Sequence, residues 1–249
     1  MSTLVEVFDD ADALATAVAG ELLARIVAAQ RSGHVPHVGL TGGSVADRIH
    51  HALGEHGPVS DVDWSRVDFW WGDERFVAAD SPDRNAGQAR RAFLDHVGVD
   101  PERVHEAPPT DHAATVDDAA SAYARELREH GSGAFEVLML GIGPDGHVAS
   151  LFPGHPALEV TDATTVAVHD SPKPPPARIS LTFEALNRSR AVWLVVSGEE
   201  KAEAVARALA PEGDVRETPA WGITGLPAGP DSPAAEVVFF LDRAAASHL

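Results

Sequence analysis

Short apolar runs alternate along the chain with longer amphipathic stretches. The apolar runs are nearly continuous, which is typical of strands buried on both faces of a parallel sheet. We expect strands at residues 67–71, 137–142, 192–196 and 237–241, a shorter strand at 38–40, and one near the N-terminus at 5–8.

The amphipathic stretches have the spacing of helices. Apolar residues recur every three or four positions in residues 10–31, 116–130 and 199–210. Residues 197–200 (SGEE) have the pattern of a capping box for the third helix. Strands that alternate with helices predict an α/β fold, in which helices flank a mostly parallel sheet on both faces. Because no linker separates two self-sufficient apolar halves, we expect a single domain over residues 1–249.

Composition narrows the class of protein. The chain of 249 residues is 44% hydrophobic and 23% charged, which is ordinary for a globular protein and excludes a disordered one. It has no cysteine, so disulfides, zinc–thiolate sites and thiol nucleophiles are excluded. The N-terminus lacks a basic segment and no apolar run reaches the roughly 18 residues of a membrane span. With a net charge of −19, the surface should repel nucleic acid and anionic lipid, and we expect a cytoplasmic protein.

A glycine-rich turn follows the predicted strand at 38–40. In LTGGS (residues 40–44), the chain passes through Gly42 and Gly43 into a helix that begins near Ser44. The free N–H groups at a helix start, together with glycines that let an anion approach the backbone, can cradle a phosphate. The alternative is a tight turn with a serine N-cap.

A second glycine-rich turn follows the strand at 137–142. In LGIGPDGHVASLFPG (residues 140–154) it presents Asp145 and His147 at the carboxyl end of the strand. An imidazole can take a proton from water near neutral pH, and Asp145 could orient it. Metal binding is the competing interpretation, but one histidine and one aspartate do not make a ligand set, so we expect no metal.

Charged residues follow the strand at 67–71. Asp73, Glu74 and Arg75 come directly after Gly72, at the edge of the sheet where ligands bind in parallel α/β folds. Charges packed there are costly unless they are paired or used. The alternative is a solvated loop with an internal salt bridge.

Two further cations are candidates for binding an anion. Lys201 lies early in the third helix, where a positive charge opposes the helix dipole. Glutamates on the same helix could offset this cost, or Lys201 could bind an anionic ligand. With Arg178 and Ser44 it would then form a phosphate pocket on an otherwise acidic protein.

Five strings in order carry a family resemblance: LTGGS, WGDER with SPDRNAGQAR, LGIGPDGHVASLFPGHP, PARISLTFEALNRSR and VSGEEKAEAV. From about residue 5 to about residue 243, the chain resembles the 6-phosphogluconolactonases, within the group that includes the glucosamine-6-phosphate deaminases. The deaminases follow the shared turn with Ala-Phe-Asn-Glu-Pro, whose glutamate assists ring opening. Here Phe152 stands at that place, and Arg75 replaces the tyrosine of the deaminase Asp-Glu-Tyr string.

The resemblance implies a Rossmann-like fold and hydrolysis of 6-phospho-D-glucono-1,5-lactone in the oxidative pentose phosphate pathway, with no cofactor and no metal. We expect His147 to be the general base, with Asp145 beside it, Arg75 to face the negative charge that develops, and Asp73 to contact sugar hydroxyls or water. The residues expected to hold the 6-phosphate are Gly42, Gly43, Ser44, Arg178 and Lys201. Which of the two arginines faces the phosphate and which the lactone is left open.

Two other functions stay open at this point: a glucosamine-6-phosphate deaminase/isomerase, and a non-catalytic sugar-phosphate sensor. The intact turn with Asp145 and His147 speaks against a sensor. The expected partner is a small phosphosugar lactone, with neither nucleic acid nor membrane, and the expected state is a monomer or weak homo-oligomer. Residues 211–233, with Trp221, match no known motif and are expected to form a lid or a surface loop. All of this requires His147 and Lys201 to lie on the same side of the molecule.

Overall fold

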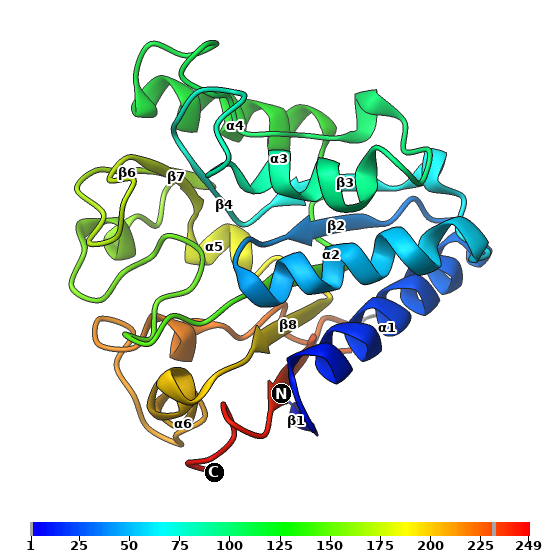
Figure 1. Cartoon of the computed structure of the whole chain (residues 1–249). Helices are drawn as coiled ribbons and strands as arrows, with labels where there is room; N and C mark the ends of the chain where they lie inside the picture. The colour runs from blue at the N-terminus through cyan, green and yellow to red at the C-terminus, as the bar shows by residue number, and fades with distance from the viewer. Residues whose placement is uncertain (1, 231–232) are drawn as a thin grey trace.

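A six-stranded parallel sheet forms the centre of the computed structural model, which describes residues 2–230 and 233–249 (Figure 1). Its strands are β1 (Ser2–Phe8), β2 (His37–Leu40), β3 (Asp68–Trp71), β5 (Val137–Leu140), β8 (Ala191–Val196) and β9 (Glu236–Asp242). Their order is β1-β9-β8-β5-β2-β3, and every neighbouring pair is parallel. The predicted strands are therefore confirmed, although β5 ends at Leu140, before the glycine-rich turn.

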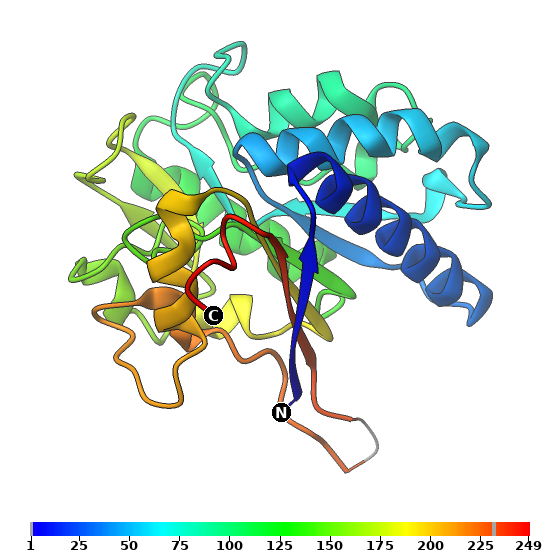
Figure 2. The same ribbon diagram turned by 60° about the horizontal axis from the view of Figure 1, so that its bottom comes forward.

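Helices cover both faces of this sheet. The helices are α1 (Ala11–Arg31), α2 (Ser44–His56), α3 (Asn85–Ala89), α4 (Val116–His130), α5 (Phe183–Leu186) and α6 (Ala202–Ala208). Side chains alternate between the two faces, so Trp71 and Trp193 pack with α1 and α2, whereas Trp70 and Leu194 pack with α4 and α6. Figure 2 shows α1 and α2 together on one side of the strands and α6 on the other. The predicted α/β fold is confirmed. None of the described helices is both long and apolar enough to span a bilayer.

A second, antiparallel sheet is absent from the sequence-based prediction. It consists of β4 (Asp73–Arg75), β6 (Thr165–Val168) and β7 (Arg178–Leu181), in the order β4-β7-β6. Because β4 follows β3 after a single glycine, this sheet is attached at the carboxyl edge of the main sheet (Figure 1). The charged string after β3 is therefore a strand rather than a solvated loop.

The predicted capping box before the third helix is wrong. Ser197 Oγ donates instead to Asp242 Oδ2 over 2.5 Å, and Gly198, with φ +106°, donates its N–H to the same carboxylate. A 3-10 turn (Glu199–Lys201) follows, and only then does α6 begin. The end of β9 thus fixes the end of β8 and the start of this helix.

A chain of ionic contacts ties β3 to α4 at the opposite, amino edge of the sheet. His105 lies between two carboxylates, with Nε2 2.9 Å from Asp68 Oδ1 and Nδ1 2.8 Å from Glu126 Oε1. Its ring stacks on Trp70 at 3.9 Å. Burial would lower the pKa of His105, but the two hydrogen bonds outweigh it and raise that pKa above its usual value. Both ring nitrogens face acceptors, so the imidazolium form fits this position.

We predict that this bridge makes stability depend on pH. The pKa of His105 is higher in the folded protein than its value of 6.5 in the unfolded chain, so binding of the proton stabilises the folded state. This stabilisation is complete at pH values below 6.5 and is lost as the pH rises through the folded-state pKa of His105. The variant His105→Gln should lose about 1.5–3 kcal/mol of unfolding free energy at pH 6, as expected for hydrogen bonds to charged groups, and less at pH 9. Urea unfolding at both pH values measures this. The exposed His34→Gln should match the unsubstituted protein at both, and an equal loss for His105→Gln at the two pH values would contradict the bridge.

Candidate active site

The glycine-rich turns after β2 and β5 and the lysine turn after β8 meet at one edge of the sheet. These three strands are neighbours in the order β8-β5-β2 and run parallel, so their carboxyl ends lie side by side. The turn with Asp145 and His147 is central, between Gly42-Gly43 on one side and Lys201 on the other. His147 and Lys201 therefore lie on the same side of the molecule, as the sequence interpretation requires.

The turn after β5 folds so that the imidazole of His147 lies against backbone. Gly143 N–H donates to the carbonyl of His147 over 3.0 Å, and Gly146, with φ +90°, closes the turn with a 2.8 Å bond to Gly143 O. A Cβ on Gly143 would overlap Cε1 and Nδ1 of His147 and lie 2.6 Å from Asp145 Oδ1. The glycine therefore makes room for the ring.

His147 and Asp145 form a hydrogen-bonded pair. His147 Nδ1 lies 2.5 Å from Asp145 Oδ1, so Nδ1 carries the proton and Nε2 is the nitrogen left to accept one. Burial works against the charge of Asp145, but the bond to His147 and the charges of His147 and Lys173 lower its pKa to about 2. The buried ring of Phe152 packs against the imidazole with its centroid 4.6 Å away. This is the arrangement of a general base with an orienting carboxylate.

Asp73 is buried where β4 meets β7. Its Oδ2 accepts from Ser150 Oγ over 2.6 Å and lies 4.0 Å from a guanidinium nitrogen of Arg178. Ser150 belongs to the segment that follows His147. Asp73 therefore links the second sheet to the segment that carries the candidate base.

Most of the N–H donors of Arg178 bond to backbone carbonyl groups of the protein. Its Nε donates to Pro175 O over 3.1 Å, and one terminal nitrogen donates to the carbonyls of Lys173 and Pro174 over 3.0 and 3.1 Å. Burial lowers its pKa, against the opposing charge of Asp73. The remaining terminal nitrogen is the one beside Asp73. In this structure Arg178 holds the proline-rich loop in place.

Arg75 and Glu74 anchor a loop beside the turn after β2. Arg75 donates to Asp83 O and to Asn85 Oδ1, both over 2.7 Å. Glu74 is buried, and its two oxygens accept backbone N–H groups from Arg75, Asn85 and Ala86, each over 2.8 Å. Burial raises the pKa of Glu74, opposed by those donors and by a nearby arginine.

The turn after β2 has the open form that the phosphate interpretation needs. Gly43, with φ +103°, precedes α2 without a side-chain cap, so Ser44 is the first helical residue and not an N-cap. Gly43 and Ser44 are exposed. A Cβ on Gly42 would overlap the side-chain oxygen of Asn85. The N–H groups at the start of this 13-residue helix are free to meet an anion.

The two lysines of the chain both lie at this edge. Burial lowers the pKa of Lys201; the charges of Glu200 and Asp242 oppose this, whereas the charge of Lys173 adds to it. Lys173 Nζ lies 3.4 Å from His147 Nδ1 and 3.7 Å from Asp145 Oδ1. The sequence interpretation does not include Lys173. The signal for it is composition, because only two of the 19 basic residues are lysine.

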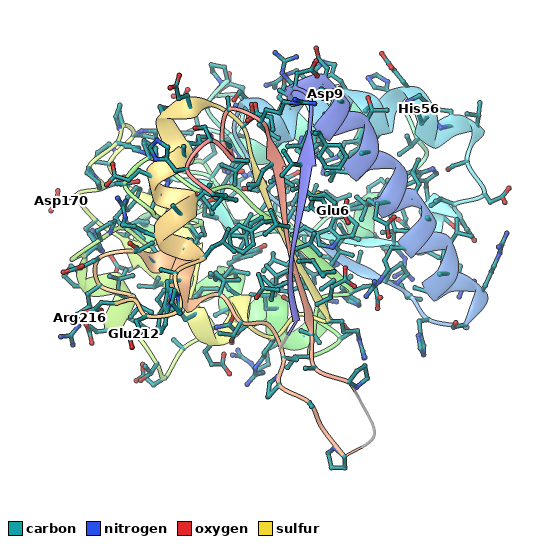
Figure 3. All side chains as sticks on the ribbon, turned by 90° about the horizontal axis from the view of Figure 1, so that it is seen from below. Glu6, Asp9, His56, Asp170, Glu212 and Arg216 are labelled. Atoms are coloured by element: carbon teal, nitrogen blue, oxygen red, sulfur yellow. The ribbon has the colours of Figure 1, made fainter. Side chains whose placement is uncertain are left out.

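The long segment after α6 packs against the turn with His147. Ala220 N–H donates to Gly146 O over 2.9 Å, and Arg216 O accepts from Gly154 N–H over 2.9 Å. Trp221 Nε1 donates to Ala210 O, which fixes the end of α6. Figure 3 shows Arg216 at the outer edge of the view, away from the sheet. Residues 231 and 232 of the predicted lid or loop lie outside the described residues.

The part of the chain that the structure describes contains no cluster of residues that could ligate a metal ion. No three or more histidine, aspartate or glutamate side chains there are grouped as a metal site.

Comparisons with known proteins agree on one family. A family model described as glucosamine-6-phosphate isomerases/6-phosphogluconolactonase matches residues 9–228. A 6-phosphogluconolactonase of Streptomyces coelicolor is 45% identical, over 96% of this chain and 92% of its own. One of Mycobacterium tuberculosis is 40% identical, over 100% of this chain and 99% of its own. The crystal structure of a 6-phosphogluconolactonase from Thermotoga maritima matches with a TM-score of 0.81 at 25% identity, covering 97% of this chain and 100% of that one.

We predict that Glu74 is essential to the stability of this edge. In Glu74→Gln an amide donor would face backbone N–H groups, and the buried Arg84 would lose a partner 3.8 Å away. Breaking a buried ionic arrangement in this way costs about 3–5 kcal/mol. Urea unfolding measures the loss. The matched variant Glu203→Gln, which breaks a surface pair with Arg207, should change stability by less than about 1 kcal/mol, and equal losses would contradict the assignment.

Proposed function

Because the chain belongs to the glucosamine-6-phosphate isomerase/6-phosphogluconolactonase family, we propose that the site at the carboxyl edge of its sheet hydrolyses 6-phospho-D-glucono-1,5-lactone to 6-phospho-D-gluconate. The activity is that of a 6-phosphogluconolactonase, an ester hydrolase of carbohydrate metabolism. The observation that carries the residue assignment is the His147–Asp145 pair, presented by a glycine turn with Nε2 left free to accept a proton.

Phe152 favours hydrolysis of a lactone over deamination. Ring opening of an amino sugar needs a group that relays a proton, and a phenyl ring cannot do so. Phe152 is buried against the imidazole, so a phenyl ring stands where the deaminases have a carboxylate. The environment suits a base that acts on water alone.

The proposed reaction begins with His147 Nε2 taking a proton from water as the water oxygen bonds to C1 of the lactone. The carbonyl electron pair moves to oxygen, and Asp145 stabilises the imidazolium that forms. The bond between C1 and the ring oxygen then breaks, and the imidazolium returns its proton to that oxygen. Water and lactone are thereby converted to 6-phosphogluconate.

The phosphate end is assigned to the start of α2 and to Lys201. Gly42, Gly43 and Ser44 offer backbone N–H groups and a hydroxyl, and Lys201 adds a charge from the next strand but one. Binding the distant phosphate would place C1 beside His147 and turn affinity into orientation.

Arg75 and Arg178 are better suited to positioning. One terminal nitrogen of Arg75, and Nε with one terminal nitrogen of Arg178, donate to protein atoms, which supports a role in holding the two loops beside the substrate. Asp73, held by Ser150, stays assigned to contacts with sugar hydroxyls or water. The cytoplasmic location, the absence of nucleic-acid and membrane partners and the monomeric or weakly oligomeric state stay predictions.

We predict that His147→Ala lowers the rate of lactone hydrolysis by about 10²–10⁴-fold, the usual contribution of a general base. Freshly made lactone is assayed, and the spontaneous rate is subtracted. His34→Ala, at an exposed position, should retain full activity. An unchanged rate for His147→Ala would remove it as the base. Ammonia release from glucosamine 6-phosphate should be absent, and robust release would reverse the choice between the two branches of the family.

Two glycines of the same turn allow a matched test of ring placement. Gly143→Ala forces the imidazole aside, and a displacement of about 1 Å costs roughly 10²-fold in rate. Thermal unfolding should change little, because the ring can rotate away. Gly141→Ala introduces a methyl group with no neighbour within 4 Å and should leave the rate intact. Equal activity of the two variants would mean that the position of the ring does not matter.

A further inference from the structure

Lys173 is a cation that takes no part in the proposed reaction of His147 with water and lactone. It lies in the proline-rich string PKPPP (residues 172–176), which carries no catalytic pattern. Its ammonium nitrogen lies 3.4 Å from His147 Nδ1 and 3.7 Å from Asp145 Oδ1. No other cation has a contact of this kind with the candidate base in the described part of the chain.

The backbone of Lys173 is fixed while its side chain is left accessible. Arg178 donates to its carbonyl over 3.0 Å, and Ser171 Oγ donates to the same carbonyl over 2.9 Å and accepts from the N–H of Lys173 over 3.3 Å. The side chain is 40% exposed. A rigid loop thus presents a lysine whose tip can still meet a ligand.

The ammonium group has unused donors. Its neighbour His147 Nδ1 donates its own proton to Asp145, so it is not an acceptor for Lys173. Asp145 Oδ1, at 3.7 Å, is beyond a normal hydrogen bond. Across the residues that the structure describes, no closer acceptor faces this group. Its three N–H donors are therefore available to substrate oxygens.

The other cations near the reacting end are partly engaged with protein atoms, and Arg75 Nε is buried without a hydrogen-bond partner. Arg75 bonds to Asp83 O and Asn85 Oδ1, and Arg178 bonds to the carbonyls of the proline-rich loop. Lysine is also the more compact charge, which can approach a single oxygen atom closely. Lys173 is thus the cation best placed to meet charge that develops beside His147.

We propose that Lys173 is a catalytic residue whose ammonium group binds the oxygen on C1 of the lactone, where negative charge develops as water adds. This rests on the proposed function. The ammonium group contacts the Nδ1 side of the imidazole, whereas the attacking water lies at Nε2. The flexible stem of this 40% exposed lysine therefore has to carry the ammonium past the edge of the ring to the oxygen on C1. The electron pair of the carbonyl moves to the oxygen that faces Lys173, and Lys173 itself keeps all of its protons throughout. Lys201 holds the phosphate, and the two lysines act at opposite ends of one substrate.

The test compares Lys173→Met, Lys173→Arg and the control Arg31→Met in hydrolysis of fresh lactone. Loss of one donor to an oxyanion lowers kcat by about 10²-fold or more, so Lys173→Met should show that loss. KM should change by less than about threefold, because the interaction strengthens only in the transition state. Lys173→Arg keeps the charge and should have an intermediate kcat. Arg31→Met removes one exposed charge at the end of α1 and should match the unsubstituted protein.

Two results would overturn the assignment. One is a kcat for Lys173→Met within about threefold of the unsubstituted value. The other is a rise in KM at constant kcat, which would place Lys173 at the phosphate. Thermal unfolding and binding of 6-phosphogluconate confirm that each variant is folded, and Lys173→Gln is read in the same way if the methionine variant is destabilised.

The failure of the proposed function is distinguishable from the failure of this assignment. If the unsubstituted chain does not hydrolyse the lactone, the proposed function fails. If the unsubstituted chain is active, His147→Ala is impaired and Lys173→Met is fully active, only the role of Lys173 fails.

Discussion

The hydrogen bond between His147 and Asp145 is the interaction on which the rest of the site depends. It decides which ring nitrogen carries the proton and therefore which one can accept another. The surroundings serve to keep it in place: Gly143 leaves room for the ring, and Phe152 supports the ring from its face. Because β5 is flanked by β2 and β8, the turn that carries the pair lies between the open helix start and Lys201. A pair built on any other strand would lack one of these neighbours.

Buried polar and charged groups fix the strand that leads into the second sheet at both of its ends. At its amino end β3 is tied through Asp68 to His105 and α4. At its carboxyl end, where β3 is at the edge of the sheet, the hydroxyl of Tyr123 bonds to both the N–H and the carbonyl of Trp71, over 2.9 and 3.0 Å. Beyond Gly72, Glu74 gathers three backbone N–H groups. These contacts satisfy polar groups that an edge strand would otherwise leave unpaired. The result is a rigid support for Asp73 beside the candidate base.

The parts of the fold that sequence could predict are those set by local pattern. Continuous apolar runs identify five of the six strands of the parallel sheet, because burial on both faces requires them, whereas the edge strand β1 exposes Leu4, Val5 and Val7. The second sheet could not be found in this way, since β4 consists of three charged residues whose pairing depends on β7, more than one hundred residues away. The capping-box prediction was wrong for a similar reason. Ser197 donates its hydroxyl hydrogen bond to Asp242, which lies 45 residues away in the sequence and is not part of any local pattern. The sequence motifs predict that the candidate base and the glycine turn after β2 lie at one edge of the sheet. Lys173 lies in a proline-rich string with no such motif, and the carbonyl of Lys173 is held by Arg178.

Arginine and lysine have different places in this site because their charged groups differ in shape and in the number of hydrogen-bond donors. The planar guanidinium offers five donors in a fixed fork, which suits it to binding several carbonyl groups of one loop, as Arg178 does here. Such a group is already engaged before a ligand arrives. The lysine ammonium has a flexible stem and a compact charge, so it can be held at its backbone and still keep its donors free. On a chain with a net charge of −19, free cations gathered at one edge of the sheet also create a local field that attracts an anionic phosphosugar. Arg178 therefore holds the loop at the side of this site, and the two lysines are the cations that we propose meet the substrate.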